Sequence, residues 1–356
     1  MKEFSCRTRI VMGCPATQVL KDRNFDRIMV VSDPFFAKNG RAQSLGQQAR
    51  DFAIFDKVVP DPSVELVAQG VAQLQQFDPD GLVALGGGSA MDCAKAMLCF
   101  SGKKIPLIAV PTTSGSGSEV TDFAILTHEG VKHPLVDEKL RPDLAILDEG
   151  MVESLPPGLI ADGGFDVLAH ALESWTAQNA NPVTDALALD AFRTVYTRLY
   201  ASYSGDKTAR LPVHTASTMA GLAFTQAGLG VCHALAHALG GQFHVPHGRL
   251  NGILLPAVIA HNGATPRYAR FARAIGLGGG SDMMALRSLK NGLMRLRHQL
   301  DLPATLEEAG VETGALRQKL PEILAAALKD PCCQTNPIPV TETLLRQILQ
   351  EVADIG

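Results

Sequence analysis

Short β-rich runs alternate with helical runs in the first part of the chain, and this alternation limits the folds available to it. The β-rich runs are mostly apolar and several end in glycine or an acidic residue, whereas the helical runs carry apolar residues at helical spacing. Strands separated by helices indicate a Rossmann-like parallel sheet with helices on both faces. The predicted strands lie at 27–33, within 49–59, and at 81–88, 104–113 and 143–149; the predicted helices lie at 64–77 and 89–100; a β-hairpin is predicted around 123–137.

The character of the sequence changes near residue 155. Beyond LPPGLIADG (155–163), Ala- and Leu-rich helical runs follow one another to the C-terminus without a convincing strand. We therefore expect an α/β domain over 1–154 and an all-helical domain over 155–356. The glycines of GLGGGSD (276–282) are expected to form an exposed turn in the second domain.

Composition narrows the class of protein. Hydrophobic residues make up 46% and charged residues 19% of the chain, as in ordinary globular proteins. A net charge of −4 without a Lys/Arg-rich run argues against a nucleic-acid partner, and no apolar run approaches the roughly 20 residues of a membrane span. Seven cysteines without framework spacing favour reduced thiols in a cytoplasmic protein.

Metal-binding residue types gather in two segments of the second domain. Asp166 and His170 in GGFDVLAHALESW are four residues apart, so a helix places both on one face. CHALAHALGG offers His233 and His237 on one face of a second helix, which the two glycines should end, and His247 follows in HVPHG.

A single helical histidine is more often an ordinary core or surface residue, and either His233 or His237 could ligate. However, five of the ten histidines fall in these two segments, namely His170, His233, His237, His244 and His247. Burying so many polar rings without a metal or a charge partner would be costly. Imidazoles and a carboxylate together suit iron(II) or zinc, and not magnesium or calcium.

Two loops of the first domain suit a dinucleotide. Gly86, Gly87, Gly88 and Ser89 connect a strand to a helix, where backbone N–H groups can approach a pyrophosphate, although a tight turn alone explains the glycines nearly as well. PTTSGSGSEVT (111–121) adds more hydroxyl and N–H groups than a connector requires. Asp33, at the end of the first predicted strand, would bind an adenosine ribose and disfavour a 2′-phosphate, unless it only forms a turn.

These motifs resemble those of the iron-containing (group III) alcohol dehydrogenase family, which shares a fold with dehydroquinate synthase and glycerol dehydrogenase. The resemblance covers nearly the whole chain and depends on GGGSAMDCAKA, PTTSGSGSEVTDFAIL, GGFDVLAHALESW and AGLGVCHALAHALGGQFHVPHGRLNGILLP. It implies an NAD-binding first domain and a metal-binding catalytic second domain. The implied metal ligands are Asp166, His170, His233 and His247, and the implied NAD-binding residues are Asp33, Gly87, Gly88, Ser89, Thr112, Thr113, Thr121 and Lys132.

Within the family, the chain most resembles the 1-propanol dehydrogenases of propanediol-utilisation microcompartments, in FSCRTRIVMG, the PDPS segment and GLGVCHALAHALGGQFHVPHG. This implies a cofactor pair of NAD(H) and Fe²⁺, with Zn²⁺ as the alternative. The expected reaction is reduction of propanal to 1-propanol, which regenerates NAD⁺. His237 is then a candidate for proton relay or substrate orientation. We further expect a homodimer or higher homo-oligomer in the cytoplasm; encapsulation with other microcompartment proteins remains open.

The sequence departs from the family pattern at several positions. Gly163-Gly164 replaces Thr-Gly, Asn251-Gly252 replaces Asn-Ala, Arg249 stands where an uncharged residue is common, and Asp61 replaces a cofactor-binding Asn. None of these removes a ligand, but Arg249 and the glycines are expected to influence metal affinity or loop rigidity.

Other functions stay open at this level. The nearest is a dehydrogenase of the same fold acting on lactaldehyde/1,2-propanediol, ethanol or a 1,3-diol. A different class is a dehydroquinate-synthase-like NAD/zinc lyase, which would need a basic pocket for a phosphorylated acid. A third is a cofactor-binding protein without catalysis, against which the intact ligand set argues.

Overall fold

The computed structural model describes residues 3–129, 131–263 and 265–353. The chain folds into two compact units. One unit spans Ser5–Leu155, and the other comprises Met1–Phe4 and Pro156–Gly356. The boundary expected after residue 154 differs from this division by one residue, and the division also assigns the N-terminal four residues to the second unit.

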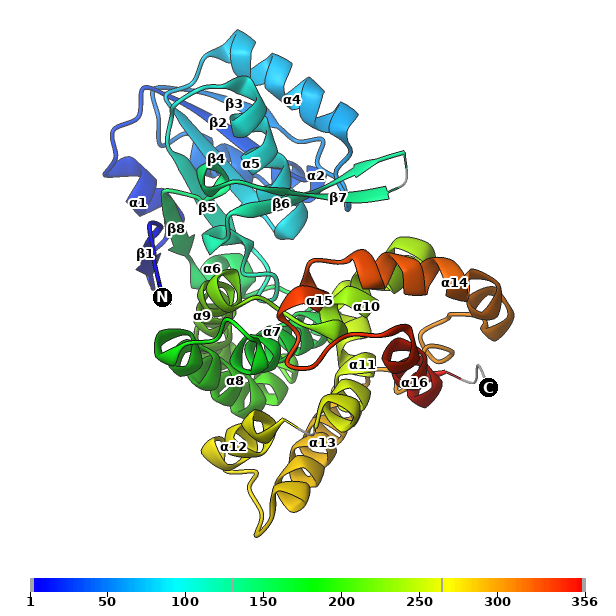
Figure 1. Cartoon of the computed structure of the whole chain (residues 1–356). Coiled ribbons are helices and arrows are strands. Elements are labelled where there is room, and N and C mark those ends of the chain that lie inside the picture. The colour runs from blue at the N-terminus through cyan, green and yellow to red at the C-terminus, as the bar shows by residue number, and fades with distance from the viewer. Residues whose placement is uncertain (1–2, 130, 264, 354–356) are drawn as a thin grey trace. The chain divides into compact units, whose positions relative to one another are not determined.

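Six parallel strands form the sheet of the Ser5–Leu155 unit, in the order β1-β8-β5-β4-β2-β3 (Figure 1). Every residue of the central strands β4 and β5 is buried, as expected for parallel strands covered on both faces. The predicted parallel sheet is confirmed, and the sequence missed only the four-residue edge strand β1. The strands are β1 (Arg9–Met12), β2 (Arg27–Ser32), β3 (Asp51–Phe55), β4 (Gly81–Gly86), β5 (Leu107–Pro111) and β8 (Leu144–Leu147).

Successive residues of each strand pack into two different apolar layers. Met29 and Leu82 belong to the layer under α4 and α5, whereas Ile28 and Val83 belong to the layer under α1 and α3. The helix pair α4 and α5 packs closely, because a Cβ on Gly70 would lie 2.5 Å from the sulfur of Met97. The helices of this unit are α1 (Ala16–Lys21), α2 (Pro34–Lys38), α3 (Arg41–Gly46), α4 (Val64–Phe77), α5 (Gly88–Ser101) and α6 (Glu149–Val152), with 3-10 turns η1 (Ser118–Val120) and η2 (Glu138–Leu140).

The predicted hairpin is present as β6 (Phe123–His128) and β7 (Val131–Val136), which pair antiparallel outside the main sheet. An isolated bridge joins Ser63 to Thr127, and Thr127 N donates a 2.9 Å hydrogen bond to Pro62 O. The hairpin is thereby attached to the turn that precedes α4.

The strand order reverses between β2 and β4. From β2 the chain passes to β3 at one side and then crosses back to β4 at the other. The carboxyl ends of strands at such a switch point are where open α/β sheets bind ligands. Asp33 follows β2 and the glycine run follows β4; a Cβ on Gly86 would lie 4.0 Å from Asp33 Oδ2. The sheet therefore brings the two predicted cofactor segments together.

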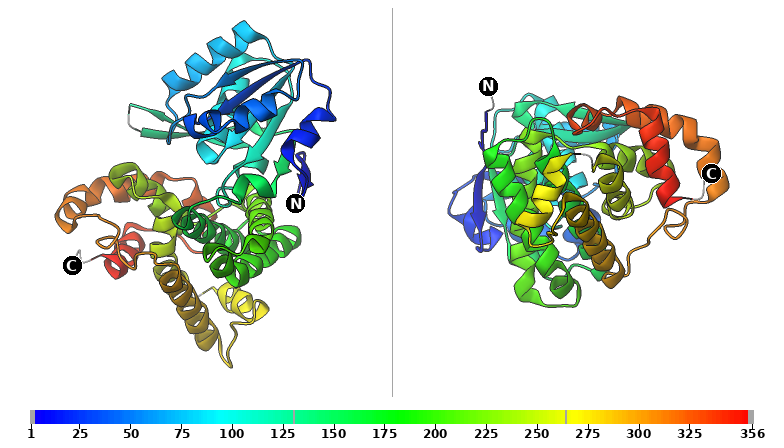
Figure 2. Two further views of the ribbon diagram at one scale, coloured as in Figure 1. Left: turned by 180° about the vertical axis from the view of Figure 1, so that it is seen from behind. Right: turned by 60° about the horizontal axis from the view of Figure 1, so that its bottom comes forward.

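The Pro156–Gly356 unit contains helices and no strand among the described residues, as the sequence predicted. The helix α7 packs against α8, α9 and α11, and α10 packs against α11 and α14 (Figures 1 and 2). The helices are α7 (Pro157–Thr176), α8 (Pro182–Tyr203), α9 (Arg210–Ala227), α10 (Val231–Phe243), α11 (His247–Asn262), α12 (Pro266–Ala274), α13 (Asp282–Gln299), α14 (Thr313–Lys329), α15 (Cys332–Thr335) and α16 (Glu342–Val352), with the 3-10 turn η3 (Lys207–Ala209).

The expected end of the second histidine helix was wrong. The helix α10 continues through Gly240 and Gly241 to Phe243, and His244 ends it in the left-handed conformation with φ of 55°. The glycines do not stop the helix because neither adopts a positive φ; the turn is made by a histidine, a residue that sequence rules seldom place there. The glycine segment predicted as an exposed turn is a loop in which Gly276, Gly278 and Gly280 are exposed.

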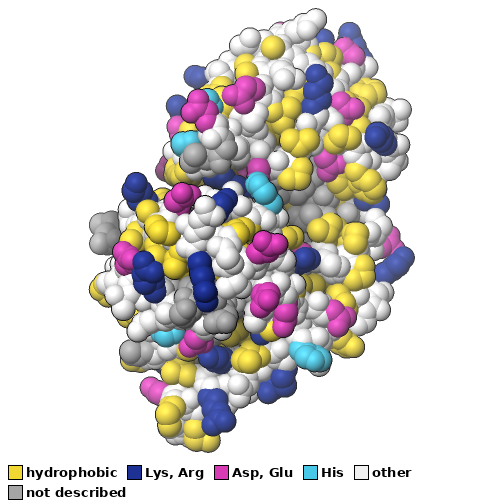
Figure 3. Space-filling view, turned by 90° about the vertical axis from the view of Figure 1, so that its right-hand side faces the viewer, with side chains coloured by type: hydrophobic (Ala, Val, Ile, Leu, Met, Phe, Trp, Pro, Cys, Tyr) yellow, Lys and Arg dark blue, Asp and Glu magenta, His cyan; other side chains and the backbone are white. Residues whose placement is uncertain are grey.

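No single helix of the described residues is both long and apolar enough to cross a bilayer. Lys207–Ala227 and Val231–Phe243 together have the length and composition of a membrane span, by those two criteria only, and a bend of 105° separates them. On the face shown in Figure 3, basic and acidic side chains are interspersed. The expected absence of a nucleic-acid partner remains a prediction.

Candidate active site

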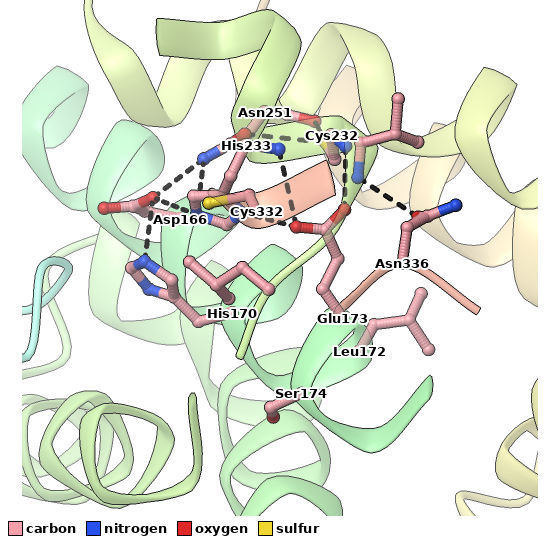
Figure 4. Close-up of polar contacts among 12 residues, drawn as sticks. Asp166, His170, Leu172, Glu173, Ser174, Cys232, His233, Asn251, Cys332 and Asn336 are labelled. Atoms are coloured by element: carbon pink, nitrogen blue, oxygen red, sulfur yellow. Dashed lines mark hydrogen bonds and ion pairs between the residues drawn. The ribbon is translucent and has the colours of Figure 1, made fainter. Parts of the chain in front are cut away.

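Three helices of the second unit contribute the candidate metal ligands. Asp166 and His170 lie one turn apart on α7, where both are buried. His233 lies in the first turn of α10 and is only 1% exposed, and His247 is the first residue of α11. The four residues predicted from the sequence therefore lie together, with the three imidazoles around Asp166. Figure 4 shows Asp166, His170 and His233 of this group.

The donor atoms are spaced as a tetrahedral metal site requires. Asp166 Oδ1 lies 3.6 Å from His233 Nε2 and 3.4 Å from His247 Nε2. Zinc–nitrogen and zinc–oxygen bonds of about 2.0–2.2 Å place tetrahedral ligand atoms about 3.3–3.6 Å apart. Asp166, His233 and His247 are thus close enough together to hold one divalent cation, and the structure places His233 rather than His237 against the carboxylate.

His170 completes the set at a slightly greater distance. Its Nε2 lies 3.8 Å from Asp166 Oδ1. The ring stacks between Phe224, at a centroid distance of 4.3 Å, and His233, at 4.5 Å. This packing holds the imidazole beside the other donors.

Glu173 orients His233 from behind. Its Oε2 lies 2.6 Å from His233 Nδ1, and its Oε1 accepts a 2.7 Å hydrogen bond from Cys232 N. A carboxylate at Nδ1 fixes that nitrogen as the N–H donor and leaves Nε2 free to bind a metal. Gly230 permits this approach, since a Cβ there would lie 2.7 Å from Glu173 Oε1.

Asn251, one turn beyond His247 on α11, reaches the same centre and is fully buried. Its Nδ2 donates a 2.8 Å hydrogen bond to Asp166 Oδ1 and lies 3.3 Å from His233 Nε2 and 3.2 Å from His247 Nε2. The amide thus orients the carboxylate among the imidazoles.

The electrostatics of the site favour an ionised carboxylate beside the imidazoles. Burial alone would raise the pKa of Asp166, but the attraction of His170 and the close contact with His233 hold it far below its usual range. Burial likewise works against a charged His233, yet the neighbouring carboxylates of Asp166 and Glu173 raise its pKa to about 9. Burial lowers the pKa of His247 well below its ordinary value. A bound cation would replace the proton on His233.

Arg249, one of the departures from the family pattern, forms an ion pair with Asp162. Its Nε donates a 3.1 Å hydrogen bond to Asp162 Oδ1, and its Nη2 donates a 3.0 Å bond to Oδ2. Asp162 lies one turn before Asp166 on α7, so the pair ties the start of α11 to the ligand helix. Between them, Gly248 lets the helices touch: a Cβ there would lie 1.9 Å from Asp162 O.

His237 lies beside the ligand set rather than in it. Its ring stacks on that of His247 at a centroid distance of 5.1 Å, with an interplanar angle of 13°. Its Nδ1 lies 2.8 Å from Asp330 Oδ2, and this contact opposes the effect of burial and lowers the pKa of Asp330 to about 2. Asp330 thus remains an anion that orients the His237 ring.

The two predicted cofactor loops of the first unit face each other. A Cβ on Gly87 would lie 3.1 Å from Thr113 Oγ1, and a Cβ on Gly88 would lie 3.4 Å from Ser116 Oγ. Gly87 is the N-cap of α5, so the N–H groups of Gly88 and Ser89, in its first turn, have no partner within the helix. Thr112 N donates a 3.0 Å hydrogen bond to Gly86 O, which joins the loops.

A buried lysine holds the serine-rich loop in place. Lys95 Nζ donates hydrogen bonds to Ser118 Oγ at 3.0 Å, Thr121 Oγ1 at 2.9 Å and Phe123 O at 2.9 Å. Asp92 accepts a 3.0 Å bond from the same Ser118 hydroxyl. Burial lowers the pKa of Lys95 to about 8, although Asp92 opposes the shift. Thr121 is completely buried, and its hydroxyl is engaged in this network.

Two other predicted cofactor residues have structural partners. Asp33 Oδ1 caps α2 by accepting hydrogen bonds from Phe35 N at 2.8 Å and Phe36 N at 3.1 Å. Lys132 Nζ lies 2.6 Å from Oδ1 of Asp61, the residue that replaces the family asparagine. Asp33 is thereby fixed at the switch point, and Lys132 links β7 to the turn before α4.

The sequence interpretation missed five residues of these sites. Glu173 lies three residues after His170 and Asn251 lies four residues after His247, so helical spacing could have found both. Asp92 and Lys95 are charges within an otherwise apolar helix, which is also a signal. Asp330 is 93 residues from His237 in sequence, and nothing local marks it.

Comparison with known proteins gives matches in both units. The model of the iron-containing alcohol dehydrogenase family matches residues 8–149, and that of the C-terminal part of the Fe-containing alcohol dehydrogenase family matches residues 160–353. A 1-propanol dehydrogenase of Citrobacter freundii is 41% identical, over 99% of this chain and all of that protein. The crystal structure of a 1,3-propanediol oxidoreductase matches with a TM-score of 0.93 and 30% identity, over 99% of this chain and 100% of that one. A sulfoacetaldehyde reductase of Bifidobacterium kashiwanohense, crystallised with NAD⁺, matches with a TM-score of 0.89 and 27% identity, over the full length of both chains.

Proposed function

The chain belongs to the iron-containing alcohol dehydrogenase family, and on that premise we propose that it interconverts a short-chain primary alcohol and its aldehyde with NAD(H) and one divalent cation, preferably Fe²⁺. The observation that carries the proposal is the convergence of His170, His233 and His247 on a single oxygen of Asp166. With Glu173 behind His233, the set supplies two negative charges against one divalent cation, which leaves the buried centre neutral.

The side chains around the cation have separable tasks in this proposal. Asp166 and the three imidazoles hold the ion; Glu173 fixes the tautomer of His233, and Asn251 orients the carboxylate. When bound, the cation supplies Lewis acidity that polarises the substrate oxygen. During reduction the carbonyl carbon accepts a hydride and the oxygen accepts a proton. We assign the exchange of that proton to His237, and its contacts with Asp330 and His247 support this assignment.

We propose that the first unit binds the dinucleotide at the switch point of its sheet. Gly87, Gly88 and Ser89 offer backbone donors at the start of α5, and Thr112 and Thr113 line the adjoining loop. We assign the adenosine ribose to Asp33, whose carboxylate would disfavour a 2′-phosphate, and this favours NAD over NADP. Thr121 acts through the Lys95 network, and Lys132 through its contact with Asp61.

We propose propanal as the substrate of the reducing direction. The 41% identity to a protein named 1-propanol dehydrogenase, over 99% of this chain and all of that protein, supports this choice. The 1,3-propanediol oxidoreductase among the structural matches supports a diol as the second candidate. The ligand geometry does not discriminate between these, because the same cation and cofactor serve both. A homo-oligomer and a place in a microcompartment remain predictions from the resemblance.

One assay tests the function directly. The protein, purified anaerobically and loaded with Fe²⁺ or with Zn²⁺, is mixed with NADH and a series of short aldehydes, and NADH absorbance is followed. We expect net NADH oxidation, with the highest kcat/KM for propanal and stronger activity with iron. A dehydroquinate-synthase-like lyase would regenerate its cofactor within each cycle, so no net oxidation with any aldehyde would contradict the proposal.

A further inference from the structure

Next to the candidate active site lies a second group of metal-binding side chains. One nitrogen, one oxygen and one sulfur atom of this group lie within 4.8 Å of one another. They belong to His237 of α10, to Asp330, and to Cys332, the first residue of α15. None of the three belongs to the Asp166 ligand set. We propose that they form a second, inhibitory cation site that prefers zinc. Figure 4 shows Cys332 in the same close-up as Asp166, His233 and Glu173.

The geometry is close to that of a coordinated cation. Zinc binds thiolate at about 2.3 Å and imidazole at about 2.0–2.1 Å, so the ligand atoms of a tetrahedral site lie about 3.3–3.7 Å apart. His237 Nδ1 and Asp330 Oδ2, now 2.8 Å apart, would separate slightly as the ion replaced their hydrogen bond. The longest separation in the group would shorten by about 1 Å at most. Side-chain rotation supplies changes of that size.

The backbone that carries Asp330 and Cys332 is already fixed. Asp330 Oδ1 accepts a 2.8 Å hydrogen bond from Cys332 N, which turns the thiol toward the carboxylate. Thr335 Oγ1, at the end of α15, donates a 2.6 Å bond to Leu229 O, and the next residue, Asn336, accepts a 3.1 Å bond at Oδ1 from Val231 N. These contacts anchor the segment to the start of α10, the helix that contributes His237. A rigid backbone lowers the entropy lost when an ion binds.

The ligand types select the ion. One thiolate and one carboxylate balance two positive charges, and the imidazole adds a neutral donor. Thiolate favours zinc over iron(II), and strongly over magnesium, whereas the first site has only nitrogen and oxygen donors. A bound cation would displace the proton of the Cys332 thiol. His237, Asp330 and Cys332 are all partly exposed, which gives a cation access from solvent.

Occupancy would block the proton role of His237. A neutral imidazole has one nitrogen lone pair, and a coordinated ring has none left to accept a proton. The inhibition therefore depends on the function proposed above, whereas the binding does not. If His237 acts as a general acid–base group, zinc in excess of one equivalent should lower kcat by about 10²-fold.

Cobalt(II) titration of the metal-free chain tests the site, because thiolate ligation adds a charge-transfer band in the near ultraviolet. We expect two equivalents of CoCl₂ to bind per chain, with the thiolate band developing with one of them. Cys332→Ser should lose that band and one equivalent. Cys333→Ser is the matched control and should keep both, because Cys333 Sγ instead donates a hydrogen bond to Ala327 O. The His247→Ala variant should retain the thiolate band while losing the other equivalent.

Saturation of the unsubstituted chain at one equivalent, or a thiolate band that survives in Cys332→Ser, would overturn the proposal. The first of these outcomes needs no variant, so misfolding cannot obscure it. Zinc inhibition is then compared in wild type and Cys332→Ser, and only wild type should lose activity above one equivalent. A chain that binds two cobalt ions but oxidises no NADH would refute the proposed function and leave the second site standing.

Discussion

Glu173 Oε2 lies 2.6 Å from His233 Nδ1, and both side chains are almost completely buried. The glutamate thus determines which nitrogen of the histidine can face a cation, and it adds the second negative charge near Asp166. Removing that carboxylate should weaken metal binding while leaving all four proposed ligands in place.

Glu173→Gln is therefore expected to lower the affinity for Fe²⁺ or Zn²⁺ by about 10–100-fold. The measurement is competition with a chromophoric chelator, and the exposed Glu322→Gln on α14 serves as the control. An unchanged affinity would show that Glu173 stabilises the helix contact only. At saturating metal, the variant should recover most of its turnover, because its ligands remain.

Gly248→Ala should disrupt the junction between α7 and α11. Its Cβ would lie 1.9 Å from Asp162 O and 3.2 Å from Asp166 Cβ, both on rigid helix atoms. We expect a loss of about 3 kcal/mol in the free energy of unfolding, measured with urea, and weaker metal binding. Gly241→Ala on α10 is the matched control. Nothing lies within 4 Å of its Cβ position, so it should gain about 0.5–1 kcal/mol.

Lys95→Met should loosen the serine-rich loop of the first unit. The substitution leaves the Ser118 and Thr121 hydroxyls without their buried donor and Asp92 without its nearby cation. We expect the free energy of unfolding to fall by about 3 kcal/mol and the Kd for NADH, from fluorescence titration, to rise. The exposed Lys104→Met should change neither quantity. Tight NADH binding by the Lys95 variant would show that the loop does not need this anchor.

His214 on α9 makes the stability depend on pH. Burial lowers its pKa from 6.5 to about 4, so between those values the unfolded chain binds a proton that the folded chain does not. Stability is then lost as pH falls through this window, by about 3 kcal/mol for this group. Urea unfolding of the metal-free protein at pH 7 and pH 4.5 should show a smaller decrease for His214→Gln. Equal decreases in both proteins would contradict the assignment.

Local patterns in the sequence were sufficient for the fold and for the ligand types. Buried strands such as β4 and the Asp166–His170 spacing depend on contacts within a few residues, which a sequence pattern records directly. The short edge strand β1 lacks that signal because it is four residues long and only partly buried. The turn at His244 was missed because a non-glycine residue adopts the left-handed conformation there.

The residues around the ligands also differ in whether the sequence could have predicted them. Glu173 and Asn251 lie on the helix faces of His170 and His247, so they could have been predicted from spacing alone. The partnerships of Arg249 with Asp162, Lys132 with Asp61 and His237 with Asp330 join residues 71 to 93 positions apart. Only tertiary packing brings them together, and a single sequence contains no record of it.

The central claim is that Asp166, His170, His233 and His247 hold the cation on which turnover depends, and His247→Ala tests it most directly. After anaerobic loading with Fe²⁺, iron per chain and NADH oxidation with propanal are measured for wild type and variant, together with NADH binding. The account predicts about one iron and turnover for wild type, and neither for the variant, with NADH binding retained. A variant that holds iron and oxidises NADH at the wild-type rate would contradict it.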